Sequence, residues 1–318
     1  MFEVRRYTPD QAEEWNHFVA QSKNGTFLFD RRFMDYHADR FEDCSMMVYR
    51  RGALYALLPA NFKGEVLTSH GGLTYGGLIM SDKCSAKGVQ ASFVAINDFL
   101  RSIAVRKVVY KAIPWIYHRQ PAEEDLFALT SICQARLIIR DISSAIIGDR
   151  KMPFSESRLS GLRKANRRGL IVKESTDFAS FWQILNDNLT SKYGVRPVHS
   201  ADELVLLNSR FPDKIRLYMV FDGEQPLGGT VLFLTPQVLH TQYISATAEG
   251  KASGAIDLLF DHLINQVFAG YRFIDFGKST SSDSADLNEQ LIFQKEGFGA
   301  RAVCYDTYEW ELKGKSEQ

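Results

Sequence analysis

The sequence predicts an α/β (α+β) protein made of two related domains in tandem. Three observations indicate this fold class. The chain has 318 residues, more than a single hydrophobic core usually supports. Helix-like and strand-like segments recur in the same order in both halves, and matching residues lie at a nearly constant separation. We therefore predict an N-terminal domain over 1–147 and a C-terminal domain over 148–318.

In the first half, apolar residues repeat either at alternate positions or every three to four positions. Trp15, Phe18 and Val19, for example, share one face of a predicted helix. The predicted order is β, α, α, three β, α, β, α, β, over residues 2–7, 9–22, 31–40, 45–49, 54–62, 71–80, 89–103, 107–113, 122–133 and 137–147.

The second half repeats this order. Its predicted elements cover 170–174, 178–191, 201–210, 215–222, 228–234, 240–246, 254–269, 272–276, 288–296 and 301–312. A separation of 165 residues relates Ala135 to Ala300 and Asp141 to Asp306, and one of 167 relates Trp15 to Trp182. This regularity favours duplication over the loose self-similarity of any α/β chain. A polar, basic stretch over 144–169 is expected to bridge the copies.

Charge and cysteine content exclude several classes of protein. Lys plus Arg equals Asp plus Glu at 38 each, so no overall field attracts DNA or an anionic membrane. The sequence has neither a run long enough to span a membrane nor a signal-like start, which predicts a cytoplasmic protein. The four cysteines are scattered singly, so we expect reduced thiols and neither a metal site nor a disulfide framework.

Several motifs in the second half resemble one superfamily. Residues 291–299, LIFQKEGFG, form a helix end closed by Gly297 with Phe298 tucked back. Residues 158–170 form a basic helix that ends in glycine and leads into a strand. Together with the segments QYISA (242–246), IDFG (274–277) and Gly228-Gly229, they resemble GNAT acyltransferases and, among these, tandem FemAB-like (Fem-type) proteins. The resemblance implies two GNAT-like domains, each with a mixed, mostly antiparallel sheet flanked by helices.

The resemblance also implies a donor site. In GNAT enzymes the donor pyrophosphate lies on backbone N–H groups at the start of the helix after the third strand, where the helix dipole favours an anion. The corresponding residues here, expected to bind acyl-CoA, are Gly250, Lys251, Ser253, Gly254 and Ala255. The usual Gln/Arg-x-x-Gly-x-Gly/Ala spacing is not met, so a glycine-rich turn that starts a helix is the alternative.

The residues for proton transfer are less well marked. Many GNAT enzymes use a tyrosine four residues before the glycine of Gly-Phe, and that position is Phe293, which cannot donate a proton. Either the acid comes from elsewhere or the donor is not a thioester. Tyr243, His240 and Asp275 are our catalytic candidates, with Glu249 nearby; His240 and Tyr243 could equally be ordinary strand residues.

The basic helix is the candidate anion site. Arg163 and Arg167 are i, i+4 neighbours, as are Lys164 and Arg168, so two ridges of positive charge could hold a phosphate. By resemblance to Fem-type proteins, Arg163 and Lys295 are expected to contact an anionic substrate from one cleft. The alternative is a solvated surface between domains.

The first copy lacks a comparable basic cluster. The residue 165 positions before Lys295 is Thr130, so we predict that the first copy has lost the chemistry. Its segment 70–77, HGGLTYGG, holds four glycines that indicate either bulges or close approach of a ligand. Our working hypothesis places acceptor binding between the copies.

Three functions remain open from the sequence. The first is transfer of an acyl group from acyl-CoA to an amine of a small molecule or sugar nucleotide. The second is a Fem-like ligase that uses aminoacyl-tRNA on a cell-wall precursor, although the long helical arm common in such enzymes is not visible. The third is a tandem protein that binds a metabolite without turnover.

Overall fold

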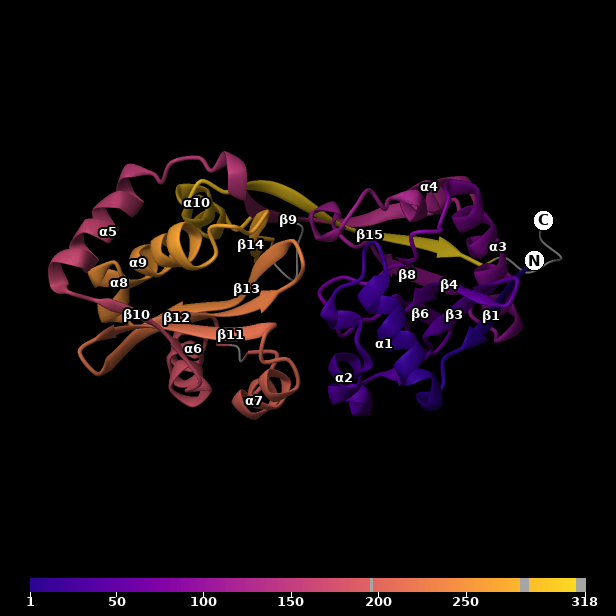
Figure 1. The fold of residues 1–318 in the computed structure, drawn as a ribbon, viewed down its shortest axis with the longest axis horizontal. Helices are drawn as coiled ribbons and strands as arrows, with labels where there is room; N and C mark the ends of the chain where they lie inside the picture. Colours follow the sequence, from indigo (N-terminus) through magenta and orange to yellow (C-terminus); the bar gives the residue numbers. More distant parts are fainter. Residues whose placement is uncertain (195–196, 281–285, 313–318) are drawn as a thin grey trace. The chain divides into compact units, whose positions relative to one another are not determined.

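The computed structural model describes residues 1–194, 197–280 and 286–312 (Figure 1). These residues form two compact units. Unit 1 comprises 1–141 together with the C-terminal segment from 304, and unit 2 comprises 142–303. Both units consist of mostly antiparallel sheet flanked by helices, as the sequence predicts.

The sheet of unit 2 has the strand order β10-β11-β12-β13-β14-β9. Neighbouring strands run antiparallel except for β13 and β14, which are parallel. The strands are β10 (Ile171–Ser175), β11 (Ile215–Asp222), β12 (Gln225–Leu234), β13 (Val238–Ala246), β14 (Phe273–Lys278) and β9 (Arg136–Ile147), of which β9 enters unit 2 at residue 142.

Helices cover both faces of this sheet (Figure 1). One face carries α6 (Phe178–Tyr193) and α7 (Ala201–Arg210). The other carries α5 (Glu156–Arg168), α8 (Ala248–Ser253), α9 (Ala255–His262) with a π-helical turn (Leu263–Val267), and α10 (Glu289–Gly297). Phe260, Phe276 and Phe298 pack together beneath this second group and form much of its core.

Unit 1 holds a four-stranded sheet with the order β1-β3-β4-β7 and a second sheet in which β15, β8, β6, β5 and β2 are successive neighbours. Its strands are β1 (Phe2–Arg6), β2 (Glu42–Asp43), β3 (Met46–Arg50), β4 (Ala53–Leu58), β5 (Asn61–Lys63), β6 (Val66–Thr68), β7 (Ile79–Met80), β8 (Lys107–Lys111) and β15 (Arg301–Glu311). Its helices are α1 (Ala12–Gln21), α2 (Arg31–Met34), α3 (Ala86–Ser102) and α4 (Glu124–Ser131). Short 3₁₀ turns lie at Pro9–Gln11, Phe27–Phe29, Asp35–Arg40 and Trp115–Tyr117, and Gly148–Arg150 forms another in unit 2.

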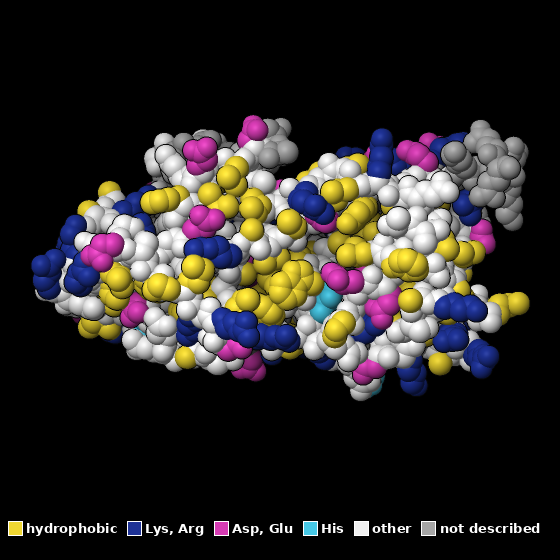
Figure 2. Space-filling view, turned by 90° about the horizontal axis from the view of Figure 1, so that it is seen from above, with side chains coloured by type: hydrophobic (Ala, Val, Ile, Leu, Met, Phe, Trp, Pro, Cys, Tyr) yellow, Lys and Arg dark blue, Asp and Glu magenta, His cyan; other side chains and the backbone are white. Residues whose placement is uncertain are grey.

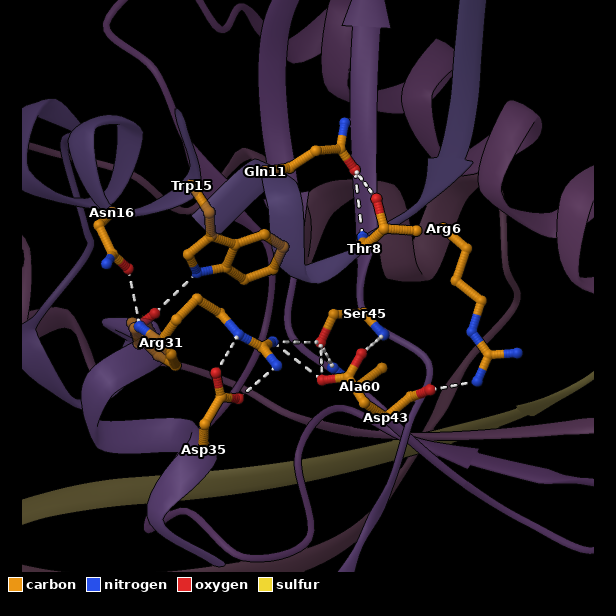
Figure 3. A network of polar contacts seen from close by, with 11 residues as sticks. Arg6, Thr8, Gln11, Trp15, Asn16, Arg31, Asp35, Asp43, Ser45 and Ala60 are labelled. Atoms are coloured by element: carbon orange, nitrogen blue, oxygen red, sulfur yellow. Dashed lines mark hydrogen bonds and ion pairs between the residues drawn. The ribbon is translucent and has the colours of Figure 1, made fainter. Parts of the chain in front are cut away.

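A buried arginine organises one part of unit 1 (Figure 3). The Arg31 guanidinium bonds the carboxylates of Asp35 and Asp43, the latter at 2.9 Å. It also lies 4.0 Å from the ring centroid of Tyr7. The indole of Trp15, itself fully buried, donates to a backbone carbonyl nearby. A desolvated charge is tolerated here because two carboxylates and an aromatic face compensate it.

The unit boundaries differ from the predicted division at 147/148. They fall inside β9 and β15, so each of these strands contributes residues to both units. Residues 143–147 of β9 pair with β14 in unit 2, whereas 307–311 of β15 pair with β8 in unit 1. The predicted bridge 144–169 is therefore part of unit 2, and its basic helix, α5, packs on α9.

Three predicted elements differ locally from the observed ones. The helix predicted over 31–40 breaks at His37, whose φ of −126° is not helical. The strand predicted over 71–80 is reduced to β7, and the helix predicted from Gly254 is preceded by α8. The glycines of segment 70–77 explain why the strand predicted over 71–80 is shorter in the structure. A Cβ on Gly76 would lie 1.7 Å from the Ser69 carbonyl oxygen, and Gly77 has a φ of +91°, so this backbone turns tightly instead of extending.

Candidate active site

The two parallel strands of unit 2 separate at one point. β13 and β14 pair through three residues each, and the last pair is His240 with Asp275. Beyond it β13 continues to Ala246 and β14 to Lys278, with no further pairing between the described residues of the two strands. Backbone groups at such a divergence are not used by the sheet, so this is where a ligand could reach the sheet interior.

Two of the predicted catalytic candidates, His240 and Asp275, are in contact at this point. His240 Nδ1 lies 2.8 Å from Asp275 Oδ2. The Asp275 side chain has no exposed surface, and its other oxygen accepts bonds from Ser143 Oγ and, at 3.2 Å, from the Gly277 N–H. A carboxylate oxygen only accepts, so Nδ1 of His240 is the donor in this contact. Nε2 is then the nitrogen that can accept a proton.

Tyr243 lies three residues further along β13. Its hydroxyl is 2.6 Å from His199 Nδ1, and its ring packs edge-on against Trp182 of α6. Burial raises the pKa of Tyr243 to about 12. The phenol therefore stays protonated at neutral pH and can act as a hydrogen-bond donor.

Lys295 of α10 is buried and binds the end of β14. Its ammonium donates to the carbonyls of Gly277 and Lys278 and to Ser279 Oγ, each at 2.8 Å. Burial lowers the pKa of Lys295 to about 8, while the nearby Asp275 charge acts in the opposite direction. All three donors of the ammonium are thus used by the chain itself.

The segment predicted to bind the donor, residues 250–255, is helical and closely packed. A Cβ on Gly250 would lie 2.2 Å from the Leu227 carbonyl oxygen, and one on Gly254 would lie 2.1 Å from that of Gly161 in α5. The N–H of Gly250 donates to Thr247 Oγ1, the N-cap of α8. The remaining predicted residues are also placed within the two helices: Ser253 and Ala255 are buried, and Lys251 binds Asn188 Oδ1.

Helix α5 covers the start of α9. Arg158 Nη1 donates to Asp257 Oδ1 at 2.8 Å, and that carboxylate lies in the first turn of α9. Burial raises the pKa of Asp257, with Arg158 opposing the change. An acidic side chain and a second helix thus occupy the position where the resemblance implies a pyrophosphate. The residues predicted for acyl-CoA therefore do not fit its pyrophosphate in this arrangement.

The basic face of α5 is exposed, and most of its charges have partners. Figure 2 looks down on this group of helices and shows Lys and Arg side chains gathered at its left end, where Figure 1 places α5. Arg163 pairs with Glu156, Lys164 donates to the Ala252 carbonyl, and Arg168 pairs with Asp222 and Glu249. Among the described residues, Arg167 has no such partner. Arg163 and Lys295 have different partners in the structure. No shared contact therefore places these two predicted residues at one anion site.

Two residues that the sequence reasoning missed complete the surroundings of the candidates. Ser143 comes from β9 and binds Asp275, and His199 precedes α7 and binds Tyr243. Two consecutive serines in an apolar strand were the only sequence signal for the first. Phe293, at the tyrosine position of many GNAT enzymes, is 69% exposed on α10 and points away from the core.

Among the described residues, no cluster of three or more His, Cys, Asp or Glu side chains could hold a metal ion. In the same part of the chain, no helix is both long and apolar enough to cross a membrane. Cys44, Cys84 and Cys133 are buried thiols, whereas Cys304 is exposed.

The splayed parallel strands, the flanking helices and the repeated order of elements define the GNAT fold in tandem. Residues 158–284 match the family model for the acetyltransferase (GNAT) domain. Beyond the matched segment, the chain as a whole has a FemAB-like tandem GNAT fold. A comparison with the curated proteins found no match to this sequence.

Solved structures share this fold over nearly the whole chain. FemX is 12% identical with a TM-score of 0.68, covering 97% of both chains. The C-terminal domain of a protein named as a lysylphosphatidylglycerol synthetase, from Agrobacterium fabrum, is 12% identical with a TM-score of 0.61, covering 96% of this chain and 92% of that one. A tandem GNAT protein from the clavulanic acid biosynthesis pathway is 10% identical with a TM-score of 0.53, covering 99% of both. At these identities the likeness concerns the fold.

Proposed function

We propose that the protein transfers an acyl group to the amine of an acceptor and that the reaction takes place in unit 2, at the divergence of β13 and β14. The observation that carries this proposal is the His240–Asp275 pair at the last paired residues of the two strands. A buried carboxylate that orients an imidazole is the arrangement of a general base.

A difference between the two units supports placing the reaction in unit 2. The residues 165 positions before His240 and Asp275 are Tyr75 and Tyr110. Neither can replace the carboxylate–imidazole pair at neutral pH, because a buried phenol is neutral; burial raises the pKa of Tyr110 well above its ordinary value. We therefore assign the chemistry to the second copy.

In the proposed reaction, the amine nitrogen of the acceptor attacks the carbonyl carbon of the donor. His240 Nε2 takes the proton that the amine loses, and the Tyr243 hydroxyl donates a hydrogen bond to the developing oxyanion. The C–N bond forms, the bond from the carbonyl carbon to the donor oxygen or sulfur breaks, and the leaving group takes up the proton. The acceptor, a small molecule, sugar nucleotide or cell-wall precursor, is otherwise unspecified.

Two donors fit this chemistry. Acyl-CoA is the first, as the GNAT resemblance implies, and its pyrophosphate would need a place other than Gly250–Gly254, which helix packing fills. Aminoacyl-tRNA is the second. It is favoured by that filled segment, by Phe293 at the tyrosine position and by the likeness to FemX. Both donors are cytoplasmic molecules, and we propose that the protein acts there.

The deciding experiment compares the two donors on the same protein. Isothermal titration with acetyl-CoA, coenzyme A and a longer acyl-CoA tests the first. A gel-shift with charged and uncharged tRNA at two salt concentrations tests the second, because phosphate contacts weaken steeply with salt. Product formation with an amine acceptor mixture then separates turnover from mere metabolite binding. If neither donor class binds and no product forms, the proposal is wrong.

A further inference from the structure

Lys295 is buried beside the end of β14, where its ammonium contacts the backbone. β14 ends at Lys278, and the carbonyls of Gly277 and Lys278 both accept from the Lys295 ammonium at 2.8 Å. The third donor goes to Ser279 Oγ, also at 2.8 Å, and Ser279 is completely buried. One side chain from α10 therefore donates three hydrogen bonds to Gly277, Lys278 and Ser279 at the end of β14.

This turn is connected to the candidate base by short steps. Gly277 has a φ of +75°, and its N–H donates to Asp275 Oδ1 at 3.2 Å. The same aspartate holds His240 Nδ1 through its other oxygen. A Cβ on Gly277 would lie 3.4 Å from His240 Cε1, so the turn also packs against the imidazole. Displacement of the turn would therefore move both partners of the pair.

Other contacts also hold the turn, and they come from β9 and from the residue that precedes α10. The Ser279 N–H donates to the Ile142 carbonyl at 2.7 Å, and the Asn288 N–H donates to the Ser279 carbonyl at 2.8 Å. Lys278 also pairs with Ser143 of β9, and Lys295 adds contacts from α10 to the carbonyls of Gly277 and Lys278. Loss of the ammonium would remove both of these contacts and would leave the buried Ser279 hydroxyl without its bond to Lys295.

We propose that Lys295 is a positioning residue: through the turn Gly277–Ser279 it holds Asp275, and with it His240, in the orientation that the transfer reaction needs. This rests on the proposed function, and it differs from the substrate contact that the family resemblance implies for Lys295. Its ammonium touches three oxygens of the chain, which leaves no donor to reach a substrate anion.

The test measures the His240–Asp275 bond directly, without donor or acceptor. The Nδ1 proton of His240 gives a low-field resonance in the proton NMR spectrum, which the His240→Gln variant identifies by its loss. We expect Lys295→Met to remove the resonance or to speed its exchange with water at least ~10-fold, since a loosened Asp275 no longer protects the proton. Lys214→Met, which removes an exposed lysine of the same unit, should leave it unchanged.

A second variant covers the case in which Lys295→Met fails to fold. Ser279→Ala removes one of the three contacts and should produce a smaller acceleration in a folded protein. An unchanged resonance in folded Lys295→Met, or in Ser279→Ala where the first variant does not fold, overturns the proposal. So does a loss of transfer with the resonance intact, because Lys295 would then act on the substrate. If the resonance responds as expected but no donor supports transfer, the positioning role stands and the proposed function fails.

Discussion

Asp275 Oδ2 lies 2.8 Å from His240 Nδ1, and these two residues are the last that β13 and β14 share as a pair. The divergence of two parallel strands and a buried carboxylate–imidazole contact thus coincide at one position of the fold. The strands bring the pair to the edge of the opening, and Ser143 and Gly277 satisfy the remaining oxygen of the carboxylate. This coincidence gives the site its chemical meaning and most of its testable consequences.

Replacing the carboxylate should remove the orientation of the base. Asp275→Asn keeps the size of the side chain, but its amide can present an N–H to His240 and favour the wrong tautomer. We expect the rate of acyl transfer at saturating donor to fall about 10²-fold to 10⁴-fold. The exposed Asp202→Asn on α7 is the matched control and should keep its rate. Equal rates for the two variants would exclude Asp275 from the reaction.

Tyr243 is expected to matter through its hydroxyl rather than through its ring. Tyr243→Phe keeps the packing on Trp182 and removes the donor. Transfer should slow by about 10²-fold, the scale of a single lost oxyanion donor. Tyr218→Phe is a stringent comparison because burial also raises the pKa of Tyr218 to about 12, yet this residue lies on β11. If both variants slow transfer equally, general loss of packing is the cause and Tyr243 has no special role.

Arg31 should contribute strongly to the stability of unit 1. In Arg31→Met, the carboxylates of Asp35 and Asp43 lose their shared cation. The free energy of unfolding should fall by about 2 to 4 kcal/mol, somewhat less than for a fully buried network because both carboxylates reach solvent. Arg32→Met removes an exposed partner of Asp30 and should cost less than about 1 kcal/mol. Urea denaturation followed by tryptophan fluorescence measures both, and equal losses would contradict the network of Figure 3.

The sequence predicted the repeated order of elements because period and length of apolar runs are local properties. It also placed His240 and Asp275 near expected strand and loop ends, and the structure brings these two side chains into contact, whereas their catalytic role stays a prediction. Ser143 could not be found in this way, because it binds Asp275 across 132 residues of chain. The division of the chain into units likewise depends on which strands pair, and β9 and β15 each pair outside the predicted boundary.

The segment 250–255, predicted to bind the donor, shows a different limit of prediction from sequence. A glycine-rich segment indicates that another group approaches the backbone closely. The sequence does not show whether that group belongs to a ligand or to the protein itself. In GNAT enzymes the approaching group is a phosphate, whereas here the carbonyls of Leu227 and Gly161 face Gly250 and Gly254. Lys295 was expected to contact a substrate because the resemblance to Fem-type proteins implies it, whereas the contacts of its ammonium include the carbonyls of a turn.

Acid should destabilise unit 1 through two buried histidines. Burial lowers the pKa of His70 from 6.5 to about 3 and that of His118 to about 4. The unfolded chain binds these protons first, so stability is lost as pH falls below 6.5. Buried Asp125 acts in the opposite direction, because burial raises its pKa from 3.8 to about 6 and the folded state binds the proton more tightly.

The two histidines together therefore outweigh Asp125. The urea concentration at the midpoint of unfolding should decrease from pH 7 to pH 5. His118→Gln should flatten this dependence, whereas Asp125→Asn should steepen it by removing the opposing contribution. A midpoint that rises on acidification, or variants that shift the slope in the reverse sense, would contradict the assignment of the three groups.

Lys295 should make the His240–Asp275 bond sensitive to mild alkali. Burial lowers the pKa of Lys295 to about 8, and the Asp275 charge is the one that opposes this shift. Above that pH the neutral amine has two N–H donors for three acceptors, so one bond to the turn Gly277–Ser279 must break. The ¹⁵N chemical shift of His240 Nδ1 should then change with a midpoint near pH 8. In Lys295→Met this step should vanish, because no group remains to titrate there, and it should persist in Lys214→Met. A step that survives in Lys295→Met would have to arise from another group, and the link between Lys295 and the imidazole would be wrong.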